Sequence, residues 1–161
     1  MLVWFAVTAV LAVLLVFDSP AADHRFVALG GVLPLVEDLS GRPWVLHTLL
    51  GAGVVLVVVM VAARGRRLVQ RRLLGIPIGM LVFLVVSGTW TRAGLFWWPA
   101  FGADAVGTGA PPEFDRPGVV LVALEVLGWL GAVWIVRRHG LDRPERRRRF
   151  VRTGRLEALQ G

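Results

Sequence analysis

Hydrophobic residues gather along the chain into four long runs that are separated by polar segments. The runs cover residues 2–17, 44–63, 73–90 and 118–136. An α-helix rises about 1.5 Å per residue and the hydrocarbon layer of a bilayer is about 30 Å thick, so about 20 apolar residues cross it. The pattern therefore predicts an all-α, polytopic membrane protein with four transmembrane helices.

The first run is the shortest, with 16 residues from Leu2 to Phe17. It would form a helix of about 24 Å, which crosses a bilayer only with help from its flanks. A secretory signal peptide is the alternative, because the sequence SPAA follows the run. The positively charged segment that precedes the apolar part of such peptides is missing, so we predict a retained membrane anchor.

A shorter apolar stretch, Phe26–Val36, lies between the first two runs. As an α-helix it would reach only about 17 Å, too short for a crossing. It would either lie in the membrane interface as a short helix or enter the membrane and return, with Gly30 and Gly31 at the bend. A bend there would bring His24 and Glu37 to the same mouth. In the third long run, Pro77 is expected to kink the helix near its start.

Arginine is distributed unevenly over the polar segments. Segment 64–72 holds five arginines and the chain after Val136 holds nine. Because short loops rich in arginine stay in the cytoplasm, we expect both on that side of the inner (plasma) membrane. This places segments 18–43 and 91–117 on the outer face. It also places both termini of the multi-pass chain in the cytoplasm.

We therefore divide the chain into a four-span bundle, residues 1–136, and a basic cytoplasmic tail, residues 137–161. Arginine clusters beside a membrane span attract anionic lipid at about 1 kcal/mol per charge. Membrane lipids, with anionic headgroups at the tail, are thus the expected partners. Nothing in the tail indicates readout of bases, so we expect no nucleic-acid partner.

Composition narrows the chemistry that the chain can perform. Hydrophobic residues make up 56% of it and the mean hydropathy is +0.68, both above the values of ordinary soluble domains. Cysteine is absent, which excludes disulfides, thiolate metal ligands and a cysteine nucleophile. Any site must use oxygen and imidazole groups.

Such groups are concentrated in what we expect to be the outer half of the bundle, namely Asp23, His24, Glu37, Asp38, His47 and Glu125. A carboxylate inside a span normally pairs with another group or takes up a proton. Imidazole with carboxylates suits a divalent transition metal such as zinc or manganese. We therefore predict a metal site with His24, Asp38 and His47 as ligands, and with Glu125 or Glu37 as general base. The alternative is that these groups only form hydrogen bonds between helices.

Longer motifs carry a resemblance to a known family. The segments DHRFVALGGVLP, EDLSGRPWVLHTLL, RRLVQRRLLGIPIGMLVFLVVSGTW and LFWWPAFG resemble the actinobacterial branch of the inner-membrane metal-dependent hydrolases of the LexA-regulated type. The resemblance covers roughly residues 20 to 102. Positions that match the family pattern are Asp23, His24, Pro34, Asp38, His47 and Gly88. The chain departs from the pattern at an aspartate, a later histidine and a later aspartate, which are replaced by Leu35, Phe83 and Ser87.

Two functions follow from this resemblance. In the first, the chain is a noncatalytic or degenerate relative, because the three departures remove groups that would serve as ligands. In the second, it is an outward-facing, metal-assisted hydrolase acting on a lipid-linked or envelope substrate. The lost histidine and aspartate favour the first.

Overall fold

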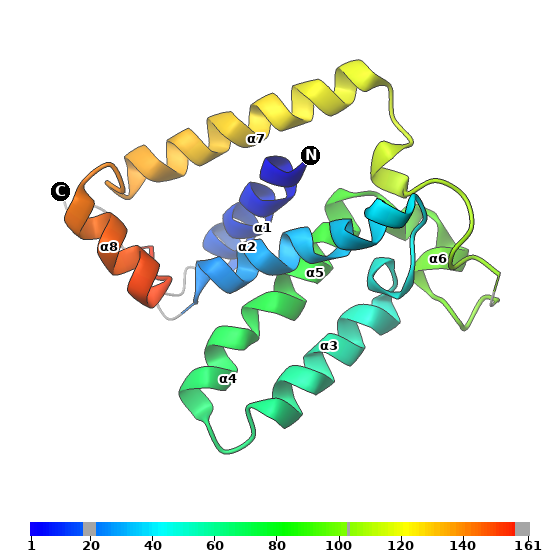
Figure 1. Cartoon of the computed structure of the whole chain (residues 1–161), viewed down its shortest axis with the longest axis horizontal. Coiled ribbons are helices and arrows are strands. Elements are labelled where there is room, and N and C mark those ends of the chain that lie inside the picture. The colour runs from blue at the N-terminus through cyan, green and yellow to red at the C-terminus, as the bar shows by residue number, and fades with distance from the viewer. Residues whose placement is uncertain (18–21, 103, 157–161) are drawn as a thin grey trace.

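The computed structural model describes residues 1–17, 22–102 and 104–156, and this part of the chain consists of helices and loops (Figure 1). The all-α prediction is confirmed. The α-helices are α1 (Leu2–Phe17), α2 (His24–Val32), α3 (Leu49–Ala62), α4 (Arg67–Leu73), α5 (Gly75–Val86), α6 (Ala93–Phe96), α7 (Gly118–Arg138) and α8 (Pro144–Thr153). Short 3-10 helices are η1 (Leu33–Ser40), η2 (Val45–His47), η3 (Thr89–Thr91) and η4 (Pro112–Phe114).

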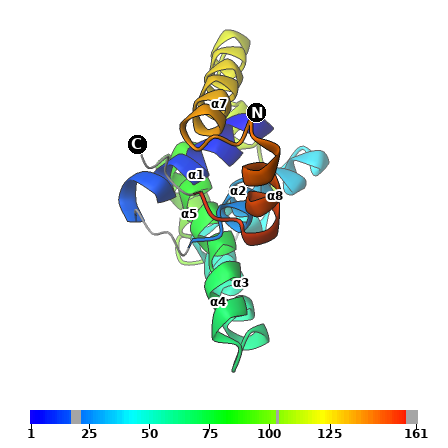
Figure 2. The same ribbon diagram turned by 90° about the vertical axis from the view of Figure 1, so that its left-hand side faces the viewer.

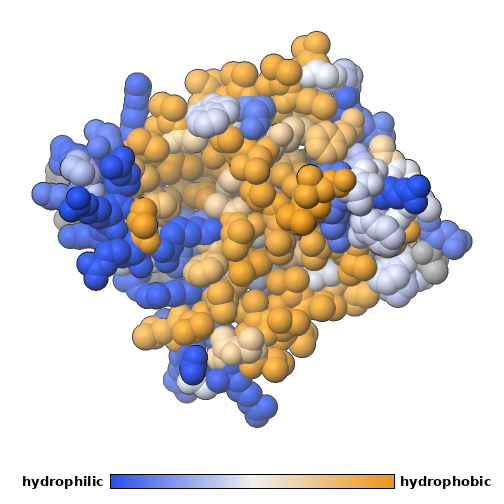
Figure 3. All heavy atoms as spheres, in the orientation of Figure 1, coloured by the Kyte–Doolittle hydropathy of each residue, from blue (hydrophilic) through white to orange (hydrophobic). Residues whose placement is uncertain are grey.

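All four predicted hydrophobic runs form helices, but they differ in length. Among the described residues, two segments are long and apolar enough to cross a membrane, Arg67–Val86 and Gly118–Arg138. The helices Leu2–Val16 and Leu49–Ala62 are apolar but shorter. In the space-filling view, a hydrophobic band runs over the middle of the molecule and hydrophilic residues flank it on the left and on the right (Figure 3).

Two helix boundaries show how single residues set the local structure. The chain turns at Leu74, between α4 and α5, three residues before Pro77. Proline lacks a backbone donor and collides with the carbonyl four residues earlier, which explains this interruption of the helix. The predicted kink stays a prediction, since Leu74 keeps right-handed helical dihedral angles. Helix α3 starts at Leu49 rather than at Trp44, because the hydroxyl of Thr48 caps it by accepting a hydrogen bond from the Gly51 backbone.

The segment after α1 forms one continuous helix. α2 runs directly into η1, and both Gly30 and Gly31 lie inside α2. The re-entrant turn at these glycines is therefore not formed. From His24 to Ser40 the two helices rise about 30 Å, the thickness of a hydrocarbon layer.

Glycines let α2 pack tightly between α1 and α5. A Cβ on Gly30 would collide with the Ile76 carbonyl, and a Cβ on Gly79 with the Val27 carbonyl. On the other face of α2, Gly31 lies against the backbone of Phe5 in α1. Small residues that allow such close approach are typical of helix contacts in membranes.

The helices are arranged as a stack. α7 lies at one edge, α1, α2 and α5 lie in the middle, and α3 and α4 lie at the opposite edge (Figure 2). α7 packs mainly on α1, where Gly128 adjoins Trp4. The central core is formed by Phe5, Ala52, Met80, Phe83 and Leu84.

The two ends of the helix His24–Ser40 lie at opposite ends of the molecule. The backbone N–H of His24 donates to the carbonyl of Gly154, directly after α8, over 2.9 Å. At the other end, Glu37 contacts His47 near the start of α3. The helix thus connects two distant parts of the molecule. That segment 18–43 lies on the outer face of the membrane stays a prediction, and residues 18–21 are outside the described residues. The helix is longer than the apolar stretch Phe26–Val36 because the polar residues at both of its ends are helical as well.

Candidate metal centre

His47 occupies the centre of a buried polar cluster. It ends η2 directly before the Thr48 cap of α3, and its side chain is fully buried. The edge of its ring contacts Phe83 of α5, with ring centroids 5.3 Å apart. The hydrophobic core therefore closes one side of the imidazole and leaves its two nitrogens to polar partners.

Glu37, at the end of η1, holds His47 in place. Its Oε2 lies 2.9 Å from His47 Nδ1 and accepts a second hydrogen bond from the Trp44 backbone N–H. Its Oε1 accepts from the Leu46 backbone N–H. One carboxylate thus fixes both the loop that carries His47 and the orientation of the ring.

The other ring nitrogen faces two more carboxylates. His47 Nε2 lies 3.0 Å from Glu113 Oε1 and 3.5 Å from Asp38 Oδ1. The Glu113 side chain is fully buried, and that of Asp38 is 10% exposed. Three carboxylates from two distant segments therefore surround one imidazole.

Glu113 comes from the long segment between α6 and α7, and arginines fasten that segment to the helices. Arg116 donates to the backbone carbonyls of Val86 and Ser87 at the end of α5. Arg92 donates to the Ala110 carbonyl and pairs with Asp115 at 2.7 Å. These contacts on both sides of η4 place Glu113 over His47.

The cluster retains protons in this arrangement. Burial lowers the pKa of His47, but its hydrogen bonds to Glu113 and Glu37 outweigh this effect and raise the pKa to about 9. Burial and the neighbouring Glu113 raise the pKa of Asp38 to about 8. Burial would also raise the pKa of Glu113, yet the hydrogen bond and charge of His47 hold it below its ordinary value. At neutral pH, a cationic imidazole therefore faces ionised Glu113 beside a protonated Asp38.

Three carboxylate oxygens of the cluster accept no hydrogen bond from another group among the described residues, and only a proton shared between Asp38 and Glu113 links their two carboxyl groups. These oxygens are Glu113 Oε2 and both carboxylate oxygens of Asp38, and all three atoms are buried. Buried polar atoms in proteins nearly always have a partner, so these atoms indicate a ligand. Ligand atoms of Asp38, His47 and Glu113 all lie within 4.8 Å of one another. Atoms about 2.1 Å from a tetrahedral zinc are about 3.4 Å apart, so the distances around His47 Nε2 suit a metal ion.

Two of the predicted site residues lie elsewhere. His24 Nδ1 is 3.2 Å from the Gly154 carbonyl, at the end of the molecule that carries α8. Beside it, Asp23 pairs with Arg25 at 2.8 Å. Glu125 accepts hydrogen bonds from the backbone N–H groups of Val3 and Trp4, one on each oxygen. It thereby satisfies donors at the start of α1 that have no partner within the helix.

The structure thus brings together Asp38, His47 and Glu37 from the predicted set and adds Glu113. The assignments of Glu37 and Glu125 as general base stay predictions, and the contacts of both favour structural roles. Glu113 was missed because its surroundings, rich in glycine and proline, indicate a mobile loop. The sequence PPEFDRP offered one signal, since closely spaced prolines stiffen a loop around its single glutamate.

Searches against protein-family models, curated proteins and solved structures found no match to this chain.

Proposed function

We propose that this chain is an integral membrane protein that binds one divalent transition metal ion, zinc or manganese, through Asp38, His47 and Glu113. The observation that carries the proposal is a set of buried carboxylate oxygens around His47 Nε2 that accept no hydrogen bond from another group among the described residues, with ligand atoms of Asp38, His47 and Glu113 within 4.8 Å of one another. Imidazole with two carboxylates is a donor set that both metals accept. Glu37, bonded to the other ring nitrogen, supplies the outer carboxylate that commonly orients a metal-binding histidine.

The membrane placement rests on the apolar helices and on the arginine distribution. We propose five crossings, formed by α1, the helix His24–Ser40, α3, the segment Arg67–Val86 and α7. The apolar part of the second crossing, Phe26–Val36, is shorter than the hydrocarbon layer. We propose that α1 and α5, which pack against it, and local thinning of the bilayer accommodate the short span, so that Glu37 and Asp38 lie beyond it at the polar end. Arginine-rich segment 64–72 and the basic tail then face the cytoplasm, and the metal site faces the opposite side. This arrangement replaces the four-span topology and moves the start of α1 to the outer half.

Hydrolysis is the second candidate function. Three protein ligands leave a coordination position for water, as in catalytic zinc sites, whereas structural zinc sites normally have four protein ligands. The resemblance to the LexA-regulated hydrolases supports this candidate in one respect. Phe83, which replaces a histidine of the family pattern, packs directly against His47. Glu113 would then replace the histidine ligand that is lost at position 83. This weakens the argument for a degenerate site.

The metal content of the protein purified in mild detergent, without chelator or nickel resin, tests the proposal. We expect about one zinc or manganese per chain, and its loss in both Glu113→Gln and Asp38→Asn. Asp104→Asn is the matched control, because this aspartate lies in the same segment between α6 and α7 but is exposed and away from the cluster. Wild-type protein without metal, and unable to bind added zinc or manganese, would overturn the proposal.

Hydrolysis has a separate test. Protein reconstituted with zinc or manganese is assayed against phosphate-ester and carboxylic-ester lipids. Metal-dependent turnover that Glu113→Gln abolishes would support the hydrolase. Stoichiometric metal without turnover would leave a noncatalytic metal-binding protein.

A further inference from the structure

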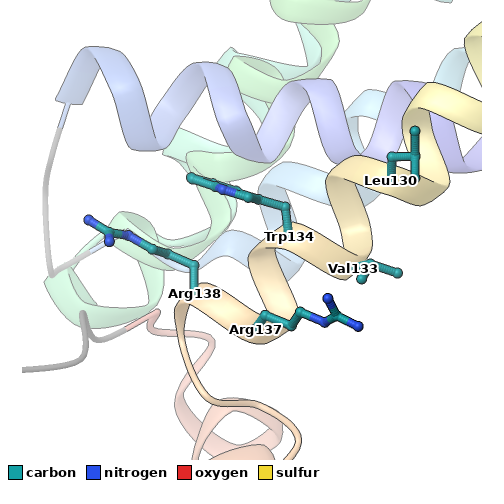
Figure 4. A pocket seen from close by; sticks show the side chains of 5 residues that line it. All are labelled: Leu130, Val133, Trp134, Arg137 and Arg138. Atoms are coloured by element: carbon teal, nitrogen blue, oxygen red, sulfur yellow. The ribbon is translucent and has the colours of Figure 1, made fainter.

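We propose that α7 carries a binding site for an anionic phospholipid. The site is an open hollow of about 530 Å³ lined by Leu130, Val133, Trp134, Arg137 and Arg138 (Figure 4). It is separate from the metal centre. The inference rests on the membrane placement proposed above, and it adds the class of lipid and the residues that select it.

The lining residues form one stripe along α7. Their spacing of three, one, three and one residues is that of a single helix face. Apolar side chains occupy the upper part of the stripe, and the two arginines lie at the end of the helix, as Figure 4 shows. Leu130, Val133 and Trp134 are all exposed to solvent by about half. A membrane-facing surface of this kind matches an acyl chain along the stripe and a headgroup at its end.

Both arginines are available for a ligand. Neither Arg137 nor Arg138 forms an ion pair or a side-chain hydrogen bond with any described residue, and both are exposed. By contrast, Arg25 and Arg92 each pair with an aspartate. Guanidinium groups bind phosphate through paired N–H donors. Figure 4 shows Arg138 on the side of Trp134 and Arg137 on the side of Val133, so a guanidinium group lies on each side of the stripe at the level of the headgroups, which suits an anionic lipid.

Trp134 fixes the depth of the site. It precedes Arg137 by one helical turn, and tryptophan is enriched where the hydrocarbon layer meets the headgroups. The polar segment that starts at His139 follows immediately. The arginines therefore lie at the boundary where a lipid phosphate is found, on the cytoplasmic side of the proposed topology.

The test uses full-length protein in nanodiscs of phosphatidylcholine containing one fifth phosphatidylglycerol. Lipid that remains bound after extraction into detergent is identified by native mass spectrometry. We expect wild-type protein to retain phosphatidylglycerol selectively, and Arg137→Gln/Arg138→Gln to lose about 30-fold in this preference because its charged hydrogen bonds to the phosphate are removed. Arg71→Gln/Arg72→Gln removes the same charge from the exposed surface of α4. This control variant is expected to keep the preference for phosphatidylglycerol.

Equal retention of phosphatidylglycerol by wild type and by the Arg137/Arg138 variant would overturn the lipid site. The lipid site would also be overturned if the Arg71/Arg72 control lost the preference for phosphatidylglycerol to the same extent, because the effect would then come from net charge alone. Failure of wild-type protein to enter pure phosphatidylcholine nanodiscs would contradict the membrane placement itself. The two failures are therefore distinguishable.

Discussion

His47 Nε2 lies 3.0 Å from Glu113 Oε1, although 66 residues separate the two in the chain. Both side chains are fully buried. Asp38 joins them from a third segment, at 3.5 Å from the same nitrogen. Since these segments meet only in the folded chain, ligand binding here depends on the packing of η1, η2 and η4 against one another.

Glu37→Gln is expected to weaken metal binding without removing a ligand. The amide can accept from the Trp44 or Leu46 backbone, but it presents no carboxylate to His47 Nδ1. Loss of such an outer carboxylate typically lowers metal affinity 10- to 100-fold. Zinc titration against a competing chelator measures the change.

The nitrogen chemical shifts of the His47 ring separate this positioning effect from general destabilisation. Wild type should show a proton held on Nδ1 in the metal-bound protein, and Glu37→Gln should show its loss or exchange. Glu37→Asp should recover part of the affinity. An unchanged affinity in Glu37→Gln would show that the carboxylate serves only the loop.

Metal-free protein is expected to lose stability between pH 6 and pH 9. The fold raises the pKa of His47 from 6.5 to about 9, so the stability from its protonated ring is complete below pH 6.5 and disappears as the pH passes 9. The fold also raises the pKa of Asp38 from 3.8 to about 8, so the stability that comes from its protonated form decreases as the pH rises to 8. Glu113 acts in the opposite direction, but only near and below its ordinary value of 4.5.

Thermal unfolding of chelator-treated protein at several pH values measures this slope. His47→Gln and Asp38→Asn should each flatten it. Zinc affinity should change the other way and rise with pH, because the metal must displace the protons of the cluster. A metal-free stability that is flat from pH 6 to pH 9 would contradict the proposed protonation of the cluster.

Glu125→Ala is expected to destabilise the protein and leave its metal content unchanged. The variant removes the acceptor of the Val3 and Trp4 backbone donors at the start of α1. A buried donor without a partner costs about 1–3 kcal/mol. Reversible unfolding in mixed detergent micelles measures the loss, and Glu145→Ala on the exposed face of α8 is the control. Loss of metal in folded Glu125→Ala would instead link this residue to the site.

Much of the helical framework could be predicted from the sequence, because it depends on local properties. The apolar run that starts at Gly118 produced α7 at the predicted residue, and Pro77 broke the helix as its missing donor requires. His47 attracted attention because an imidazole next to a span needs polar partners. These inferences need only the chain neighbours of each residue.

The remaining features depend on contacts between distant segments. Glu113 belongs to the site only because Arg116 and Arg92 fasten its loop to other parts of the chain. His24 was assigned to the site because it was expected in the same half of the bundle as His47, and a bend at Gly30 and Gly31 would have brought it to Glu37; in the structure these glycines allow close packing rather than a turn. Composition alone cannot distinguish these two uses of glycine.

Gly30→Ala is expected to destabilise the packing of α2 on α5. The added methyl group would collide with the Ile76 carbonyl, which belongs to backbone and cannot rotate away. Overpacking of this kind costs about 1–3 kcal/mol. Gly53→Ala in α3 is the matched control, because its methyl group would meet no atom within 4 Å and alanine favours a helix by about 1 kcal/mol. Equal stability of the two variants, measured by unfolding in detergent, would contradict the close contact of α2 and α5.

The number of crossings can be tested by cysteine labelling, because the natural chain has no cysteine. Single cysteines are introduced at Thr108, at Arg147 and in a short tag before Met1, and intact cells are treated with a maleimide that cannot cross the membrane. With five crossings, the tag and Thr108→Cys are labelled from outside, and Arg147→Cys is labelled only after lysis. With four crossings and both termini inside, the tag would react together with Arg147→Cys. The tag therefore decides between the topologies, because the helix His24–Ser40 crosses the membrane in one and not in the other.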